Sequence, residues 1–272
     1  MIDLDNYMIQ GEPDQKERGH IWHTAIGLQK TDGLKTSDYL IEIANRNING
    51  DITLAEAKEL INNYYTEKPL HANDDSRTDE ADKVSANISV ILAQKAFNLS
   101  PVEYISIHRE LFNGIYKFAG KIRDYNISKK EWVLNGETVY YTGANSIRET
   151  LEYDFALEKD FKYNGLSQIQ ISEHIAKFTS GIWQIHAFGE GNTRTTAVFT
   201  IKYLQSLGFD VTNKIFAENA WFYRNALVRA NYTNLKKGIH ATQEHLNRFF
   251  ANLLLGEQNE LKNRDLKLTN EI

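Results

Sequence analysis

The sequence contains no cysteine, which excludes a disulfide framework and a thiolate metal site. Only three of its 272 residues are proline, so long uninterrupted helices are permitted. It has no surplus of positive charge: the net charge is −5, whereas a nucleic-acid scaffold usually carries a basic field. No apolar run approaches the roughly 18 residues of a membrane-spanning helix, and the opening MIDLDNYMIQ lacks signal-peptide features. We expect a cytoplasmic protein without a membrane or nucleic-acid partner.

The composition that remains is ordinary for a globular protein, with 42% hydrophobic and 25% charged residues. Helix-starting signals and apolar residues at helical spacing recur along most of the chain. A polar run interrupts them and is typical of a linker. We therefore expect an N-terminal helical unit at 1–66, a linker or the start of an inhibitory helix at 67–82, a main domain at 83–260 and a solvated tail at 261–272.

The main domain is expected to be all-α with one β-hairpin. Ser100 can cap a helix, Pro101 suits its first position, and Glu103 completes a capping box. Asn135-Gly136 is the dipeptide that a two-residue hairpin turn prefers, because both positions need φ > 0. Strand-forming side chains lie on both sides of it, so the sequence predicts a lone hairpin among helices.

The stretch HAFGEGNTRT, residues 186–195, lies between two apolar helical patterns and predicts a helix, a short loop and a second helix. Gly189 and Gly191 can adopt backbone conformations that other residues resist. The first N–H groups of the second helix have no intrahelical partner and attract anions, most often phosphate. Asn192 can add its amide donor, and the planar fork of Arg194 can reach a second phosphate group.

Two further groups complete the pattern. Glu190 makes chemical sense beside phosphates if it holds Mg²⁺, which prefers oxygen ligands and bridges phosphate oxygens. His186 can accept a proton from an incoming hydroxyl, because an imidazole titrates near working pH. A base, a metal ligand, an anion site and an arginine together indicate phosphoryl or nucleotidyl transfer.

The segment HAFGEGNTRTTA resembles the Fic-family motif, H-P-F-x-[D/E]-G-N-[G/K]-R-x-x-R, and IRDYNIS and FYRNALVRAN are also similar to Fic sequences. The resemblance covers about residues 81–260 and implies a Fic fold, in which a helical bundle carries a β-hairpin flap. It also implies a protein adenylyltransferase, which moves AMP from ATP to a hydroxyl side chain of a target protein. The target carries a Ser, Thr or Tyr, and the chain itself is one candidate.

By position, the resemblance makes His186 the general base and Glu190 the Mg²⁺ ligand. It implies that the nucleotide binds at a set of motif residues and two later positions: Gly189, Glu190, Gly191, Asn192, Thr193, Arg194, Tyr223 and Asn231. The flap would hold the target by strand addition, with Lys129, Lys130, Glu131 and Trp132 facing target or nucleotide.

Three motif positions depart from the family pattern. Ala187 replaces proline, Thr193 replaces a small or basic residue, and Ala197 stands where the second arginine belongs. That arginine contacts the γ-phosphate in the family, and its loss is worth about 1.5 to 3 kcal/mol. Arg123 and Lys129 are the nearby cations that can substitute for it. A different donor is the alternative: another nucleoside triphosphate, a γ-phosphate donor or a phosphocholine donor.

The N-terminal region suggests regulation. IANRNINGDITLAEAKELINNYY resembles the small helical antitoxins that accompany some bacterial Fic toxins, and we hypothesise that it covers the active site. Ser76 and Glu80 resemble the inhibitory motif of other Fic proteins, although Ala81 departs from it. Glu80 is therefore a candidate inhibitory residue, with an acidic helix start as the competing interpretation. A degenerate, non-enzymatic Fic module stays open as a function, and monomer and homodimer stay open as assembly states.

Overall fold

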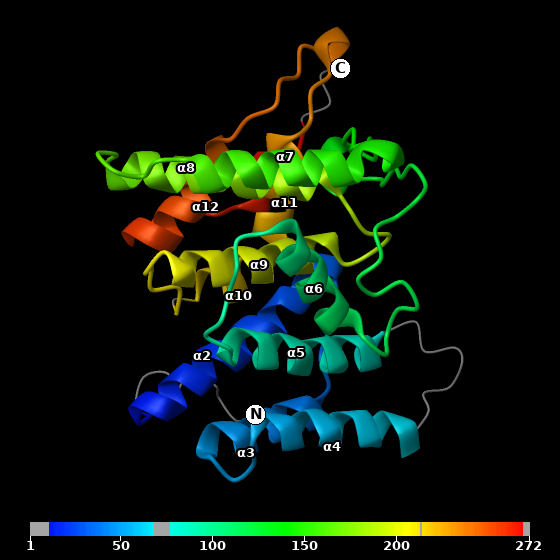
Figure 1. Cartoon of the computed structure of the whole chain (residues 1–272), viewed down its shortest axis with the longest axis vertical. Coiled ribbons are helices and arrows are strands. Elements are labelled where there is room, and N and C mark those ends of the chain that lie inside the picture. The colour runs from blue at the N-terminus through cyan, green and yellow to red at the C-terminus, as the bar shows by residue number, and fades with distance from the viewer. Residues whose placement is uncertain (1–10, 68–76, 213, 269–272) are drawn as a thin grey trace. The chain divides into compact units, whose positions relative to one another are not determined.

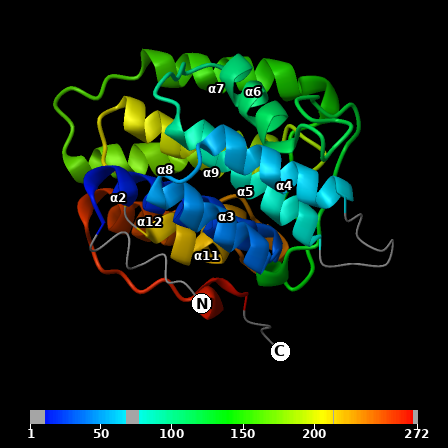
Figure 2. The same ribbon diagram turned by 90° about the horizontal axis from the view of Figure 1, so that it is seen from below.

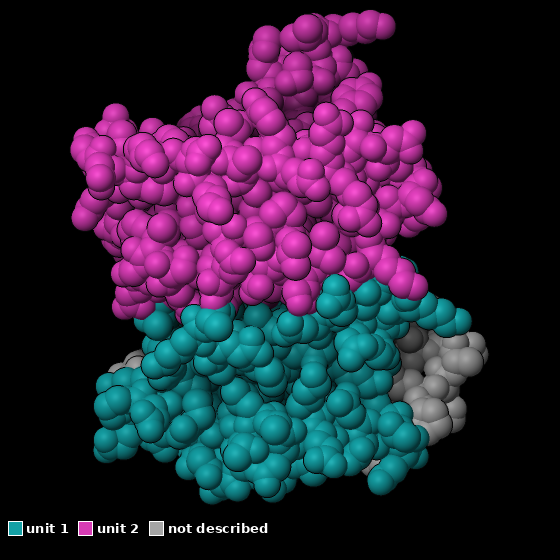
Figure 3. All heavy atoms as spheres, viewed as in Figure 1, with its two compact units in different colours: residues 1–96, 109–119, 212–220 teal, residues 97–108, 120–211, 221–272 magenta. Residues whose placement is uncertain are grey.

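The computed structural model describes residues 11–67, 77–212 and 214–268. This part of the chain is predominantly helical, as the sequence predicts, and it contains no β-strand (Figure 1). None of its helices is long and apolar enough to cross a membrane. The chain divides into two compact units (Figure 3). Unit 1 comprises residues 1–96, 109–119 and 212–220, and unit 2 comprises residues 97–108, 120–211 and 221–272.

Unit 1 is built mainly from helices that follow one another closely along the chain, and α10 joins them from a later part of the sequence. In Figures 1 and 2, α4 runs beside both α3 and α5. Ser37 accepts a hydrogen bond from the backbone N–H of Leu40 and so caps α3, which ends where Gly50 adopts φ 84°. The helices of this unit are α2 (Pro13–Gly27), η1 (Leu28–Asp32), α3 (Asp38–Asn49), α4 (Leu54–Glu67), α5 (Thr78–Ala93) and α10 (Ile215–Glu218).

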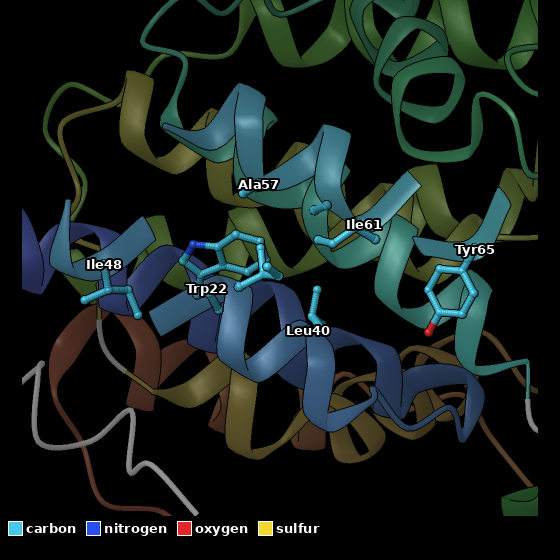
Figure 4. Close-up of a cluster of buried hydrophobic side chains, with 9 residues drawn as sticks. Trp22, Leu40, Ile48, Ala57, Ile61 and Tyr65 are labelled. Carbon is cyan, nitrogen blue, oxygen red and sulfur yellow. The ribbon is translucent and has the colours of Figure 1, made fainter. Parts of the chain in front are cut away.

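The core of unit 1 forms around the indole of Trp22, which α3 and α4 enclose with aliphatic side chains (Figure 4). The indole N–H donates to Asn47 Oδ1 over 2.9 Å, so its polar group is satisfied inside the core. Fully burying each large apolar side chain contributes about 1.5 to 3 kcal/mol, which makes this cluster the main stabilising feature of the N-terminal helices. Its buried members include Leu40, Ile48, Ala57, Ile61 and Tyr65.

A buried carboxylate also links three helices of unit 1. Asp82 of α5 is fully buried and accepts hydrogen bonds from the backbone and the hydroxyl of Ser37 at the start of α3. The hydroxyl of Tyr65 in α4 donates to it over 2.6 Å. Burial raises the pKa of Asp82, and the three donors act against that rise because they stabilise the carboxylate.

Gly27 marks a close approach of α2 to α10 inside unit 1. A Cβ at this position would lie 2.4 Å from the Cα and 2.5 Å from the carbonyl oxygen of Ala217. Since these are backbone atoms, the contact cannot be relieved by a rotamer change. We expect Gly27→Ala to lower the free energy of unfolding by about 1 to 3 kcal/mol, measured by urea denaturation.

The control for this prediction is Gly181→Ala in the middle of a helix of unit 2. A Cβ there would meet its nearest neighbour, Asp154 Oδ2, at 3.6 Å, an ordinary contact. Alanine also favours a helix over glycine, so this variant should lose no stability. Equal stability of Gly27→Ala and the wild type would contradict the packing described for α2 and α10.

Unit 2 contains the segments that carry the sequence motif. Its α8 contacts α7, α9 and α12, and the side chains of α9 are buried through most of its length. The longer helices are α7 (Ile147–Asp160), α8 (Gln168–Ile185), α9 (Asn192–Ser206), α11 (Ala220–Ala230) and α12 (Glu244–Leu255), while α6 (Pro101–Phe112) begins in this unit. The 3-10 turns are η2 (Trp132–Leu134), η3 (Ala144–Ser146), η4 (Leu235–Lys237) and η5 (Asn263–Leu266).

The sequence predicts a β-hairpin around Asn135-Gly136, and the structure contains the turn but not the strands. Asn135 and Gly136 both have positive φ, 54° and 91°, and the N–H of Glu137 donates to the carbonyl of Leu134 across them. The residues before the turn form η2 instead of a strand, because the N–H of Leu134 bonds back to the carbonyl of Glu131. We call residues 127–142, which contain this turn, the flap loop.

The C-terminal segment is also less exposed than expected. Leu266 is buried, and the N–H of Leu268 donates to the carbonyl of Val133 in the flap loop over 2.8 Å. The side-chain amide of Asn135 donates to the carbonyl of Leu268, and the ammonium of Lys267 lies over the ring of Trp132. Residues 267 and 268 therefore contact the flap loop, and Leu266 is buried, so the segment is not solvated throughout. Residues 269–272 of the expected tail lie outside the described residues.

Candidate active site

His186 ends α8 in an unusual backbone conformation. It has φ 50° and ψ 56°, the left-handed region that a non-glycine residue adopts only when its surroundings impose it. The guanidinium of Arg123 holds this turn in place by donating to the carbonyl of His186 over 2.7 Å, and it also bonds the carbonyls of Tyr125, Thr142 and Ile185. The backbone that carries the imidazole is therefore fixed from outside the helix.

The imidazole of His186 is enclosed rather than open to solvent, with 3% of the residue exposed. The ring of Tyr141 lies over it with centroids 4.0 Å apart, and Trp183 meets it edge-on at 5.4 Å. Neither ring nitrogen has a hydrogen-bond partner in the part of the chain that the structure describes. Burial lowers the pKa of His186 well below its ordinary value, and the positive charge of Lys129 lowers it further. The ring is neutral at pH 7, which is the form that accepts a proton.

Tyr141 is held over the imidazole by a buried ion pair. Its hydroxyl donates to Glu131 Oε1 over 3.2 Å, and Glu131 Oε2 lies 2.8 Å from a guanidinium nitrogen of Arg224. Glu131 is 1% exposed, and burial raises its pKa although Arg224 favours the charged form. This corrects the expectation that Glu131 faces a target: its carboxylate is buried because it pairs with Arg224 and supports Tyr141.

The loop after His186 is closed by the side chain of Asn192. Its Oδ1 accepts from the N–H of Phe188 over 3.0 Å, and its Nδ2 donates to the carbonyl of Phe188 over 2.7 Å. This differs from the expectation that the amide is a phosphate donor, because both of its polar atoms bind the loop backbone. Asn192 shapes the loop, and its contribution to an anion site is limited to its backbone.

His108 of α6 anchors the same loop from the other side. Its Nδ1 accepts from the N–H of Gly120 over 2.8 Å, so its Nε2 carries the proton and donates to the carbonyl of Glu190 over 3.1 Å. Its ring stacks on Phe188 with centroids 3.7 Å apart. The residue is fully buried, and burial lowers its pKa to about 4. Sequence reasoning missed His108, since a single histidine in a helix carries no motif.

The start of α9 has the geometry of an anion site. Gly191 precedes the helix with φ 77°, a conformation suited to glycine. The first intrahelical bond runs from the N–H of Thr195 to the carbonyl of Gly191, so the N–H groups of residues 192–194 precede the hydrogen-bonded ladder and lie at the positive end of the helix dipole. Thr193 accepts from the indole of Trp183 over 3.0 Å, and Arg194 is fully buried at this position.

Glu190 is the acidic group of the loop and forms an ion pair with the flap loop. The ammonium of Lys129 lies 3.2 and 3.1 Å from its two carboxylate oxygens. The side chains are 24% and 35% exposed, respectively. The chemistry of Glu190 fits the expected Mg²⁺, since Mg²⁺ is usually bound through one or two carboxylates together with substrate phosphates. Binding there would require Lys129 to leave the carboxylate.

Tyr223 and Asn231 are placed differently from the motif residues. Tyr223 is fully buried with its ring against Phe249. Its expected role in lining a nucleoside pocket stays a prediction. The Nδ2 of Asn231 donates to the hydroxyl of Ser180 over 2.8 Å and thus ties α11 to α8. Asn231 also lines a cavity of about 580 Å³, whose other lining residues come mainly from α7 and α8.

A second cavity, of about 750 Å³, lies beside the flap loop. Lys129 lines it while reaching Glu190, so the cavity adjoins the motif. Lys130, which also lines it, is exposed, and Trp132 of the same loop is 45% exposed. The other lining residues are Ser128, the turn at 136–138, Tyr140 and residues 232–236. Among the four flap residues singled out in the sequence, Lys130 and Trp132 are thus the ones available at the surface.

The candidate inhibitory residue Glu80 lies in the first turn of α5 in unit 1 and is 6% exposed. The guanidinium of Arg77 donates to both of its oxygens, and the hydroxyl of Tyr116 donates over 2.6 Å. Ser76 lies outside the described residues. Residues 78–82, expected to be a linker or the start of an inhibitory helix, form the beginning of α5.

Comparison with known proteins assigns the motif-bearing segment. Residues 98–204 match the sequence model of the Fic/DOC family. Residues 98–204 are thus the part of the chain that is similar to Fic/DOC proteins. The protein adenylyltransferase VbhT of Bartonella schoenbuchensis is 28% identical over 105 residues, which are 39% of this chain and 21% of VbhT. The matched part thus spans about a fifth of that relative, and the family match lies after residues 1–66, whose expected similarity to antitoxins stays a prediction.

The Fic fold is also found among solved structures. A Fic family protein from Desulfovibrio desulfuricans G20 superposes with a TM-score of 0.52 at 13% identity, covering 92% of this chain and 68% of that one. The N-terminal Fic domain of an effector protein from Bartonella sp. AR 15-3 gives a TM-score of 0.49 at 18% identity, over 64% of this chain and 81% of that domain. The similarity to the Desulfovibrio desulfuricans protein concerns the fold alone.

Proposed function

We propose that the Fic domain transfers AMP from ATP to a hydroxyl side chain of a target protein. The observation that carries this proposal is the position of a neutral imidazole, His186, at one end of a short loop whose other end is the start of α9. Glu190 lies between the two. The similarity to a protein adenylyltransferase supports the choice of AMP as the transferred group.

His186 would take the proton of the target hydroxyl as its oxygen attacks the α-phosphorus of ATP. A new oxygen–phosphorus bond forms, the bond from the α-phosphorus to the bridging oxygen breaks, and pyrophosphate leaves. The N–H groups at the start of α9 would hold the phosphates, assisted by Arg194. Glu190 would hold Mg²⁺, which supplies neutralisation of the phosphate charge when bound.

Tyr141 controls access to His186 in this proposal, because its ring covers the imidazole. Since the Tyr141 ring covers the imidazole at 4.0 Å, a hydroxyl reaches His186 only after that ring moves aside. Tyr141 belongs to the flap loop, and the cavity beside this loop adjoins Glu190 through Lys129. We therefore place the target in that cavity and infer that its entry displaces Tyr141. The target is another protein or a second site on the chain itself.

The proposal is tested by measuring which labelled phosphate group of ATP becomes attached to protein. The purified protein is incubated with Mg²⁺ and ATP labelled in either the α- or the γ-phosphate, and label retained on protein is measured together with the intact mass. Retained α-label and a mass gain of one AMP are expected. Retained γ-label alone would replace the proposal with a kinase-like reaction. If a panel of candidate targets and the chain itself take up neither label, a non-enzymatic module is favoured instead.

A further inference from the structure

The Fic domain lacks a cation at the place where the family motif ends. Ala197 stands at the position of the second arginine, and its methyl group is fully buried in α9. The phosphate contacts proposed so far are the start of α9 and Arg194, and a site that distinguishes ATP from ADP requires a further contact with the terminal phosphate, for which a cation is the strongest donor. The following inference rests on the proposed function and identifies that cation.

Arg123 is excluded by its hydrogen bonds. Its guanidinium donates to four backbone carbonyls and is 5% exposed. A phosphate contact would break several of these bonds and release the backbone of His186, which Arg123 holds. Arg123 is therefore a positioning residue for the imidazole.

Lys129 has the properties that Arg123 lacks. Its partner in the structure is a side chain, Glu190, that the proposed reaction assigns to another cation. Its ammonium sits on a flexible four-carbon stem and is partly exposed, so it can move without disturbing a backbone. Through this ion pair its ammonium reaches the motif loop that follows His186.

Charge repulsion from Mg²⁺ determines the position of the Lys129 ammonium when ATP binds. An ammonium and a divalent cation repel each other strongly at the distance of a shared carboxylate. Occupation of Glu190 by Mg²⁺ would expel the ammonium, and the phosphate oxygens that accompany the metal are the nearest anions of the incoming ligand. We propose that Lys129 rests on Glu190 in the empty site and binds the terminal phosphate of a nucleoside triphosphate, replacing the arginine absent at position 197.

In this role, Lys129 determines how much more tightly the site binds a nucleoside triphosphate than a nucleoside diphosphate. The α- and β-phosphates are assigned to the start of α9 and Arg194, so ADP keeps its contacts without Lys129. ATP has one more phosphate, and a charge-assisted hydrogen bond to it is worth about tenfold or more in affinity. The preference for ATP over ADP should therefore depend on the charge at position 129.

The test is calorimetric titration of MgATP and MgADP into the full-length protein and into single variants. We expect Lys129→Met to weaken MgATP binding about tenfold while MgADP binding changes less than about twofold. Lys129→Arg keeps the cation and should retain most of the preference for ATP. Lys159→Met removes an exposed lysine of α7, outside the motif and the flap loop, and is the matched control, which should bind both nucleotides as the wild type does.

The other outcomes separate the inference from the proposed function. Equal weakening of both nucleotides in Lys129→Met, or unchanged ATP binding, overturns the role of Lys129 and leaves the adenylyltransferase proposal standing. Tighter ATP binding would mean that Lys129 only blocks the carboxylate, and it also overturns the inference. A wild-type protein that binds neither nucleotide in the presence of Mg²⁺ would remove the proposed function itself.

Discussion

Alanine at position 186 is expected to lower the rate of AMP transfer by about two to four orders of magnitude, the usual contribution of a general base. The loss follows from the imidazole being the neutral basic group at the end of the motif loop, between the start of α9 and the flap loop. Nucleotide affinity should change little, because the proposed phosphate contacts come from α9 and Arg194. Initial rates with α-labelled ATP and calorimetric titration of MgATP separate the two effects.

The exposed His240 provides the matched control, since His240→Ala removes an imidazole outside the motif and should leave the rate unchanged. The pH profile adds an independent check. Because burial and Lys129 lower the pKa of His186, the wild-type rate should begin to fall only well below pH 6.5 on acidification. Lys129→Met should move that fall toward higher pH. A loss of less than tenfold in His186→Ala would contradict the assignment of this residue as the base.

Acidification from pH 7 to pH 4 is expected to lower the free energy of unfolding by about 3 kcal/mol through His108 alone. The pKa of His108 is about 4 in the folded protein and near its ordinary 6.5 in the unfolded chain, so the unfolded state binds the additional proton. This contribution begins below pH 6.5 and is complete once the pH reaches the folded value. Protonation is resisted because Nδ1 accepts the N–H of Gly120 and would have to become a donor.

The measurement is a series of urea denaturations between pH 7 and pH 4 on the wild type and on His108→Gln. Glutamine keeps an amide that can donate toward Glu190 and does not titrate in this range. Other titrating groups, including Asp82 and Glu131 with their raised pKa values, act in both proteins, so the difference between the two slopes isolates His108. Parallel slopes would show that His108 is not buried as a neutral acceptor.

Local sequence signals predicted the elements whose determinants lie within a few residues. Ser100 accepts the N–H of Glu103, and α6 begins at Pro101 as the capping pattern indicated. The left-handed pair at Asn135-Gly136 followed from the same kind of local rule. The adjoining strands were predicted wrongly, because η2 forms before the turn and the partner of Val133 is Leu268 from a distant part of the chain.

The side-chain arrangement inside the candidate site depends on contacts between residues far apart in the sequence, which no local pattern predicts. His108 reaches the motif loop across 82 positions, and Tyr141 covers His186 because a buried pair, Glu131 and Arg224, fixes its hydroxyl. Asn192 was identified as a motif residue, but the direction of its amide depends on the loop closing over Phe188. The identities of motif residues were thus readable from the sequence, whereas their orientations were set by tertiary packing.

The carboxylate of Asp82 limits how far α3 and α4 can separate from the rest of unit 1. Detaching α3 and α4 from α5 would remove Ser37 and Tyr65 from a fully buried anion and open the cluster around Trp22. These helices should therefore gain and lose amide protection against hydrogen exchange together with α5. Cutting the chain after residue 66 would damage a shared fold instead of lifting off a separable cap, and a regulatory release of this segment would require melting rather than dissociation.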